Sequence, residues 1–371
     1  MNVLILFSSP GIGGAEQSLL RMVASSSENV HYQIANFGGD GPLRRRSYEL
    51  KLNYFRLHLS DSRFSQWLPR VFEDLFSVRN CLKSSDLDIA YVIGFKASVF
   101  VRIMGIFNSK LKVVHGIRWN PNTFSALDLG LRLFESVFTW SISGYICNSR
   151  AAACTLKTKA RVSSNKLWVI YNGLDSIDYA SEPLVQTGEN VVVIVATLAP
   201  RKGQLPFISN VVRTFDKLEL RCKFIFVGRD DMQGRAQELV DAYSLSHLVE
   251  FTGFVSDPRE FVLASSLVVV PSLANEGCPT VILEAMALQR VVVAFDIDGI
   301  SELVEHNVTG LLVPNRDYAA LAEAMLTLLM SPELRLEMGV RARKRVMAEF
   351  SIDDCANKHF DVFSRLVGTD N

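Results

Sequence analysis

The sequence has 371 residues, of which 49% are hydrophobic, 21% charged and 10% aromatic, and this length suggests two globular domains. These fractions exclude a chain disordered through most of its length, a collagen-like chain and a disulfide scaffold. Basic and acidic residues both number 39, which excludes nucleic-acid binding through overall basicity. The charge is nevertheless divided unevenly, because residues 1–180 carry 21 basic and 13 acidic side chains, whereas residues 181–371 carry 18 and 26.

The chain opens with the apolar run VLILF at residues 3–7. No basic residues precede it and no small-residue cleavage site follows, so we interpret it as a buried strand rather than a signal peptide. The most membrane-like stretch, residues 89–107, contains Lys96 and Arg102, and no transmembrane helix is predicted. The six cysteines are scattered without a C-x-x-C pair, which favours a reducing compartment. We therefore expect a cytoplasmic protein that can attach peripherally to the cytoplasmic face of a membrane.

A glycine-rich turn follows this first strand. Gly11, Gly13 and Gly14 precede a helix expected to start near Ala15, and such a turn lets the backbone approach an anion at the helix N-terminus. Glu16 stands where the dinucleotide fingerprint requires a third glycine, and no Lys-Ser or Lys-Thr pair follows as a P-loop requires. The alternative is a tight turn without a ligand.

Short apolar runs alternate with longer amphipathic stretches along the whole chain. Runs rich in Val and Ile suit parallel strands buried on both faces, and they lie at 3–7, 89–93, 112–115, 144–148, 167–171, 191–196, 223–228 and 267–271. The amphipathic stretches suit helices, and they include 15–25, 204–218, 317–330 and 332–349. This alternation predicts an α/β fold with two doubly wound, Rossmann-like domains.

The polar, turn-rich segment 172–190 precedes the strongest strand of the chain and marks the expected domain boundary. We predict a first domain over 1–175, a second over 176–350, and a C-terminal helix within 351–371 that packs back toward the first domain.

His115 follows the apolar run LKVV and precedes Gly116. We expect it at the carboxyl end of a first-domain strand, facing the cleft between the domains. A packed, hydrogen-bonded histidine in the interior is the alternative.

Arg201 and Lys202 lie in VATLAPRKGQ, just past the first strand of the second domain. Ligands of open α/β sheets bind at the carboxyl edge of the strands, and a lysine there is a compact cation suited to a diphosphate. The alternative is an ordinary surface turn.

The segment PSLANEGCPTVILEAMALQ places Glu276 and Glu284 eight residues apart, with Pro279 suited to the first turn of a helix that runs to about Gln289. Side chains on a helix lean toward its N-terminus, so Glu284 should point back toward the loop that carries Glu276. An ionised glutamate can accept hydrogen bonds from the vicinal hydroxyls of a ribose or hexose. The backbone N–H groups of Thr280 and Val281 suit a phosphate.

Two other interpretations of Glu276 and Glu284 remain. Glu284 can be a buried residue satisfied by local backbone, with Glu276 a solvated loop residue, and paired glutamates can also serve glycoside hydrolysis, although nothing else in the sequence supports that chemistry. Asp296 and Asp298 form a D-x-D sequence of the kind that binds metal, but this signal alone is weak, and we expect no metal and no cofactor.

Taken together, five segments resemble those of the retaining GT-B glycosyltransferases of family 4, in the same order: GGAE at 13–16, VIYNGLD at 169–175, PRKG at 200–203, the Glu276 to Glu284 segment and GISELVEHNVTGLLVP at 299–314. The resemblance implies a GT-B fold with an acceptor-binding first domain and a nucleotide-sugar-binding second domain. It also implies metal-independent sugar transfer with retention of configuration. The expected donor is a UDP-sugar, and the expected acceptor is a saccharide or lipid-linked saccharide of cell-surface polysaccharide or glycolipid synthesis.

The resemblance also assigns roles to residues. It implies catalytic roles for His115, Lys202 and Glu276, and donor-binding roles for Gly13, Gly14, Arg201, Lys202, Glu276, Gly277, Thr280, Val281 and Glu284. Glu284 would hold the ribose, Lys202 and the Thr280 and Val281 amides the diphosphate, and Glu276 and His115 the transferred sugar. Thr197 stands where many members have a second cation, and Arg201 is the candidate replacement.

Two further hypotheses remain beside the transferase. The missing cation at Thr197 motivates a catalytically weak, sugar-nucleotide-binding scaffold subunit. A nucleotide-sugar epimerase on the same architecture is the third hypothesis, although no segment resembles its acid/base pair.

A membrane surface is an additional expected partner. Basic and aromatic residues are interleaved between 44 and 112, and this composition suits an anionic membrane surface. The residues are Arg44, Arg45, Arg46, Lys51, Tyr54, Phe55, Arg56, Arg63, Phe64, Trp67, Arg70 and Phe72. The alternative is a solvated basic loop with buried aromatic residues.

Overall fold

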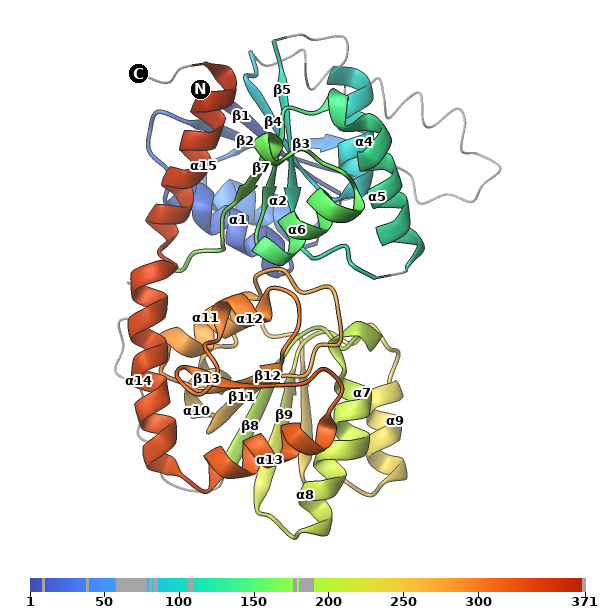
Figure 1. Ribbon diagram of the computed structural model, residues 1–371, viewed down its shortest axis with the longest axis vertical. Coiled ribbons are helices and arrows are strands. Elements are labelled where there is room, and N and C mark those ends of the chain that lie inside the picture. Colours follow the sequence, from blue (N-terminus) through green and yellow to red (C-terminus); the bar gives the residue numbers. More distant parts are fainter. Residues whose placement is uncertain are drawn as a thin grey trace. The chain divides into compact units, whose positions relative to one another are not determined.

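The computed structural model describes residues 1–8, 11–37, 40–57, 79, 82, 86–105, 110–123, 125–175, 179 and 190–368. The chain forms two units, Met1–Gly173 with Ile352–Asn371, and Leu174–Ser351 (Figure 1). Each unit is built around one parallel sheet. Most of the polar segment expected to link two domains, 176–178 and 180–189, lies outside the described residues.

The first unit holds a seven-stranded parallel sheet in the order β3-β2-β1-β4-β5-β6-β7. Its strands are β1 (Asn2–Phe7), β2 (His31–Phe37), β3 (Asn53–Leu57), β4 (Ile89–Ile93), β5 (Lys112–Ile117), β6 (Gly144–Cys147) and β7 (Leu167–Val169). The strand order reverses direction between β1 and β4, which is the topological switch point of a doubly wound sheet.

Helices cover both faces of this sheet. The hydrophobic cluster on one face includes residues of α1 (Gly14–Ala24), α2 (Pro42–Glu49) and α15 (Ile352–Val367), and the cluster on the other includes residues of α4 (Phe95–Gly105) and α6 (Arg150–Lys159). The helix α5 (Ala126–Phe138) lies beside α4, where the rings of Phe95 and Phe134 are 5.5 Å apart. Leu4 and Leu6 of β1 enter one cluster while Val3, Ile5 and Phe7 enter the other, which explains why this strand is apolar throughout.

The second unit repeats the architecture with a six-stranded parallel sheet in the order β10-β9-β8-β11-β12-β13. Its strands are β8 (Asn190–Val195), β9 (Cys222–Val227), β10 (Val249–Gly253), β11 (Leu267–Val270), β12 (Val292–Phe295) and β13 (Gly310–Val313). Its helices are α7 (Gln204–Phe207), the π-helix η6 (Ile208–Val212), α8 (Arg213–Lys217), α9 (Arg235–Ala242), α10 (Arg259–Ala264), α11 (Thr280–Ala287), α12 (Ile300–Leu303), α13 (Tyr318–Leu329) and α14 (Pro332–Glu349). Here the switch point lies between β8 and β11.

The structure confirms the predicted fold class, since all eight apolar runs form strands and the amphipathic stretches form helices. One stretch differs in detail, because residues 204–217 change from α to π and back to α geometry. Five strands in the described part of the chain were not among the predicted runs: β2, β3, β10, β12 and β13. Of these, the edge strands β3 and β10 are only partly buried and carry charged residues such as Arg56 and Glu250, so they lack a continuous apolar pattern.

The C-terminal helix α15 packs on the first unit. Its His359 and Phe363 rings lie 5.7 and 5.5 Å from the ring of Tyr91 on β4, and Ser25 after α1 donates a hydrogen bond to Asp353. None of the helices in the described part of the chain is long and apolar enough to cross a bilayer.

Candidate functional site

The loops that follow β8 and β11 bring Lys202 and Glu276 together at the switch point of the second sheet. Lys202 Nζ lies 2.5 Å from Glu276 Oε1, although the two residues are 74 positions apart in the sequence. The lysine side chain is 17% exposed and the glutamate side chain 6%, so both are largely buried and part of the lysine stays in contact with solvent. Ligands of doubly wound sheets bind at this position, because the strands on its two sides lead into loops that diverge.

The turn that carries Lys202 has an obligatory glycine. Residues Pro200–Lys202 form one turn of 3-10 helix, and Gly203 follows with a φ of +74°. A Cβ on Gly203 would lie 2.0 Å from the carbonyl oxygen of Pro271, which begins the loop of Glu276. The PRKG segment therefore needs its glycine so that the lysine turn can approach the second loop closely.

The side chain of Gln204 makes two hydrogen bonds to the backbone that precedes the same turn. Its Nε2 donates to the carbonyl of Thr197 at 3.0 Å, and its Oε1 accepts from the backbone N–H of Ala199 at 3.3 Å. Arg201 is exposed, and its carbonyl accepts from the N–H of Leu273 at 2.8 Å. The backbone of the predicted PRKG segment is thus held on both sides.

The backbone of Glu276 is held by Asp298, which belongs to the weak D-x-D metal motif. Asp298 Oδ2 accepts from the N–H of Glu276 at 3.1 Å, and the N–H of Gly299 donates to the Glu276 carbonyl at 3.3 Å. Asp296 instead accepts from the hydroxyl of Ser301. Both aspartates of the D-x-D sequence therefore serve as acceptors within the loops, and the described residues hold no group of His, Cys, Asp and Glu arranged for a metal.

The helix α11 starts directly after this loop. Pro279 precedes its first residue, Thr280, and no side chain caps the N-terminus in the part of the chain that the structure describes. Thr280 and Val281 are half-buried, whereas Glu284, one turn further along, is 8% exposed. The partial positive charge of the helix N-terminus therefore lies in sequence next to the loop of Glu276, at two residues that are partly exposed. The helix ends at Ala287, two residues before the predicted end.

In the first unit, the glycine-rich turn after β1 leads into α1 as expected. The helix begins at Gly14, and the N–H of Gly13 donates to the side chain of Glu16 at 2.9 Å. At the switch point of this sheet, Ser8 Oγ donates to the carbonyl of Ile93 at 2.9 Å. One N–H of the glycine turn is thus already satisfied by the helix that follows it.

The structure corrects the expected position of His115. The strand β5 continues two residues beyond it, to Ile117, and the imidazole has no exposed surface. Its Nδ1 lies 2.9 Å from Glu135 Oε1, and Glu135 also accepts from Arg102 Nη2 at 2.6 Å. His115 is therefore the packed residue of the alternative interpretation and does not project from the end of the strand.

Burial also determines the protonation of this cluster. Desolvation lowers the pKa of His115, although the hydrogen bond to Glu135 opposes the shift. Burial alone would raise the pKa of Glu135, but the interactions with His115 and the guanidinium of Arg102 leave it below its usual value. A neutral imidazole that donates from Nδ1 to an ionised carboxylate satisfies both directions.

Polar residues that the sequence analysis did not single out occupy the carboxyl edge of the first sheet. Arg118 follows β5, is 8% exposed, and donates to Ser18 Oγ at 3.1 Å and to Asn172 Oδ1. Asn148, which follows β6, donates to the carbonyl of Arg118 at 3.2 Å. Arg118 and Asn148 each come directly after the last residue of a strand, but this signal could be used only once the structure had placed the ends of β5 at Ile117 and of β6 at Cys147.

The predicted basic surface of the first domain is only partly described. Arg44 pairs with Asp40 at 2.6 Å, and Arg46 pairs with Glu49 at 2.8 Å, so part of the positive charge of α2 is neutralised locally. The remaining members of the patch include several that lie outside the described residues, namely Arg63, Phe64, Trp67, Arg70 and Phe72.

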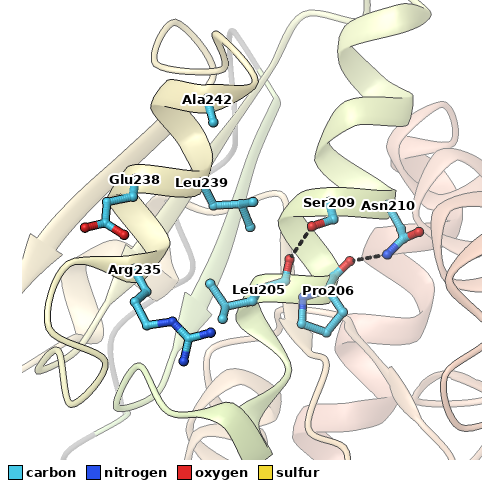
Figure 2. Close-up of a pocket in the computed structure, with 8 residues that line it drawn as sticks. All are labelled: Leu205, Pro206, Ser209, Asn210, Arg235, Glu238, Leu239 and Ala242. Carbon is cyan, nitrogen blue, oxygen red and sulfur yellow. Dashed lines mark hydrogen bonds between the residues drawn. The ribbon is translucent and has the colours of Figure 1, made fainter.

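A groove of about 560 Å³ lies elsewhere in the second unit, between α7 with η6 and α9 (Figure 2). Its lining is mostly short or aliphatic, with Arg235 and Glu238 on the α9 side. None of the residues predicted to bind a donor lines it, and we do not assign it to the candidate site.

Two family models match the chain and meet close to the boundary between its two units. Residues 12–176 match Glycosyltransferase Family 4, and residues 176–345 match Glycosyl transferases group 1.

Two curated relatives each match about half of the chain. The alpha-D-kanosaminyltransferase of Streptomyces kanamyceticus is 29% identical over 180 residues, which are 47% of this chain and 46% of that protein. The poly(ribitol-phosphate) alpha-N-acetylglucosaminyltransferase of Staphylococcus aureus is 27% identical over 177 residues, which are 47% of this chain and 36% of that protein. The chain thus spans about half the length, or less, of these two curated relatives.

Solved structures match the whole chain. Anabaena HepE in complex with UDP and glucose aligns with a TM-score of 0.81 and 22% identity, covering 98% of this chain and 99% of that one. A complex of S. aureus TarM that contains UDP aligns with a TM-score of 0.79 and 14% identity, covering 98% and 100%. These likenesses show that the fold is GT-B.

Proposed function

The chain belongs to glycosyltransferase family 4, and from that premise we propose that it transfers a sugar from a nucleotide-sugar donor to an acceptor hydroxyl with retention of anomeric configuration. The observation that carries the proposal is the Lys202–Glu276 pair at the switch point of the second sheet, followed directly by the uncapped N-terminus of α11. This arrangement suits a diphosphate, which needs a cation and backbone N–H donors.

The chemistry requires stabilisation of a departing diphosphate. When the bond between the anomeric carbon and the diphosphate oxygen breaks, negative charge grows on that oxygen. Lys202 and the N–H groups of Thr280 and Val281 would then stabilise the developing charge without a metal ion. Glu276 holds the ammonium group of Lys202 before the donor binds, and its carboxylate can accept hydrogen bonds from the sugar hydroxyls.

We propose the remaining donor contacts from the resemblance to family 4. Glu284 is a nearly buried carboxylate one turn into α11, and we assign it to the ribose hydroxyls. Gly277 and Arg201 belong to the loops on the two sides of the Lys202–Glu276 pair, and we assign them to the donor as well. Gly13 and Gly14 are assigned to the junction of donor and acceptor, whereas the buried His115 is not proposed to contact the sugar.

We propose UDP as the nucleotide of the donor. One structurally similar protein, Anabaena HepE, was solved with UDP, with UDP and glucose and with UDP-glucose, which supports this choice. For the acceptor we propose a saccharide or a lipid-linked saccharide of cell-surface polysaccharide or glycolipid synthesis, at the cytoplasmic face of a membrane. Relatives named for amylovoran biosynthesis and for poly(ribitol-phosphate) modification support an acceptor of this kind.

A panel of UDP-, GDP- and ADP-sugars tests the proposal. The favoured donor should raise the melting temperature, since a ligand at about 100 times its Kd adds about 2.7 kcal/mol to the free energy of unfolding. It should also release its nucleoside diphosphate when a saccharide acceptor is supplied, in the presence of EDTA as in its absence.

The outcomes separate the competing functions. Donor binding without any turnover would favour the scaffold subunit that the replacement at Thr197 suggested. An isomerised sugar nucleotide formed without acceptor would favour the epimerase. Lys217→Ala, which removes an exposed lysine of α8, is the matched control for Lys202→Ala in every assay.

A further inference from the structure

The helix α5 exposes its apolar residues and buries its charged ones. Leu129, Leu133 and Val137 recur every fourth residue and are 46%, 68% and 55% exposed, and Trp140 just beyond the helix is 64% exposed. The three charged residues of the same helix are at most 7% exposed: Asp128, Arg132 and Glu135. Residues four apart share a helix face, so the exposed apolar side chains form one continuous stripe, which we call the α5 stripe.

Specific contacts hold the helix in this orientation. Asp128 accepts from the backbone N–H of Thr123 at 3.2 Å, and Arg132 donates to the carbonyl of the same residue at 3.0 Å. Glu135 lies in the buried cluster with Arg102, where the contact is 2.6 Å. Rotating α5 to bury the stripe would break these contacts and leave the buried guanidinium of Arg102 without its counter-ion, which is strongly unfavourable.

A stripe of this kind is unusual on a chain that contacts only water. Single exposed apolar residues are common, but a contiguous apolar patch marks a surface that contacts another molecule. The stripe contains no charged side chain, and a tryptophan stands at its end, as at the boundary between lipid and water.

The stretch of sequence that contains α5 carries a positive net charge, which favours an anionic partner. Between residues 89 and 172 the sequence has 11 basic residues and only two acidic ones, Asp128 and Glu135. Both acidic side chains have no exposed surface, so the charged groups that this stretch exposes are all cationic.

Lysines flank the helix at both ends. Lys159 donates to Asn122, just before α5, and Lys166 donates to the carbonyls of Thr139 and Ile142, just after it, at 2.8 Å each.

We propose that the chain binds the surface of an anionic lipid bilayer through the α5 stripe, with the flanking lysines at the level of the headgroups. A helix of 13 residues is about 20 Å long, shorter than the roughly 30 Å of a hydrocarbon core, so α5 lies in the interface and does not cross it. The surface is a different one from the basic segment that the sequence analysis favoured. The inference goes beyond sugar transfer, because binding to vesicles needs neither donor nor acceptor.

Flotation of the full chain with vesicles tests the proposal. The vesicles are phosphatidylcholine alone, or phosphatidylcholine with phosphatidylglycerol. We expect binding to the anionic vesicles only, decreasing with added salt because screening weakens surface charge attraction. The double variant Leu133→Glu, Val137→Glu should bind at least about tenfold more weakly, since charge on the lipid-facing side of an interfacial helix opposes insertion.

Matched controls test whether the loss of vesicle binding is specific to the α5 stripe. Leu336→Glu places the same charge on α14, where the leucine is 64% exposed, and it should bind vesicles as the parent chain does. Quenching of tryptophan fluorescence by brominated lipid should be lost in Trp140→Phe. Unchanged release of nucleotide from a soluble donor and acceptor by the double variant would separate this proposal from the proposed function.

Two results would overturn the proposal. Equal recovery of the parent chain with neutral and anionic vesicles is one. The other is a dimer, measured by light scattering without lipid, that the double variant dissociates, because the stripe would then be the contact between two copies of the chain.

Discussion

Glu135 Oε1 lies 2.9 Å from His115 Nδ1, and both side chains are completely buried in the first unit. The carboxylate also pairs with Arg102, so one glutamate of α5 contacts a strand histidine and a cation of α4 at once. This contact connects the sheet to the helix whose opposite face forms the α5 stripe.

Glu135→Gln should therefore destabilise the first unit. Removing the negative charge leaves the guanidinium of Arg102 buried without its counter-ion, and breaking a buried pair in this way costs about 3–5 kcal/mol. Urea unfolding would measure the loss, with Glu337→Gln on the exposed face of α14 as the control. A loss below about 1 kcal/mol would mean that water or a relaxed conformation satisfies Arg102.

Acid should destabilise the first unit before its carboxylates are protonated. Burial lowers the pKa of His359 to about 4, and burial lowers the pKa of His115 as well. The unfolded chain therefore binds more protons below pH 6.5, and the free energy of unfolding should fall as the pH drops from 6.5 toward 4. The slope should approach about 1.4 kcal/mol per pH unit for each histidine.

His359→Gln should remove part of this slope, whereas His31→Gln, which changes an exposed residue, should leave it unchanged. Unfolding measured at a series of pH values supplies both comparisons. Equal slopes in the parent chain and His359→Gln would show that His359 does not become protonated on unfolding in this range.

Gly203→Ala should damage the donor site through the backbone. The added Cβ would lie 2.0 Å from the carbonyl oxygen of Pro271, and its residue would also have to adopt a φ of +74°. Gly234→Ala is the matched control, since its φ is +85° and its Cβ would meet nothing within 4 Å. We expect a larger fall in melting temperature and in UDP affinity for the first variant, and equal effects would argue against the close approach of the two loops.

Lys202→Ala should lower turnover by roughly two to three orders of magnitude if the lysine stabilises the departing diphosphate as an oxyanion-hole donor does. Thr197→Arg should preserve or raise turnover, because it restores a second cation near the phosphates. Steady-state release of UDP measures both. Wild-type turnover in Lys202→Ala would transfer the role to Arg201, the other cation of the turn.

Glu284→Ala should weaken nucleotide binding more than it changes stability. Hydrogen bonds to a charged group contribute about 1.5–3 kcal/mol, which corresponds to a loss of roughly tenfold to a hundredfold in affinity for UDP. Calorimetric titration of UDP into the folded variant is the measurement. Unchanged affinity would exclude Glu284 from the ribose site.

The sequence by itself determined the doubly wound architecture and the segments that carry the candidate site residues. Strands buried on both faces must be apolar throughout, so runs such as 191–196 and 267–271 could be recognised as strands without a structure. The glycine after Lys202 and the proline before α11 could be recognised too, because the first adopts a positive φ and the second suits the start of a helix. The positive φ of Gly203 and the start of α11 depend on neighbours in the chain, whereas the close approach of Gly203 to Pro271 became visible only in the structure.

Tertiary structure decided which side chains meet. Lys202 and Glu276 lie together because β8 and β11 are adjacent in the sheet, and strand order is not encoded in any local pattern. His115 faces inward because β5 extends to Ile117, and a polar residue within an apolar run reveals its surroundings only when its partner, here Glu135, comes from another element. The α5 stripe has the same origin. Hydrophobicity predicts that leucines are buried, but three charged residues found partners in the interior, and the opposite face was left exposed.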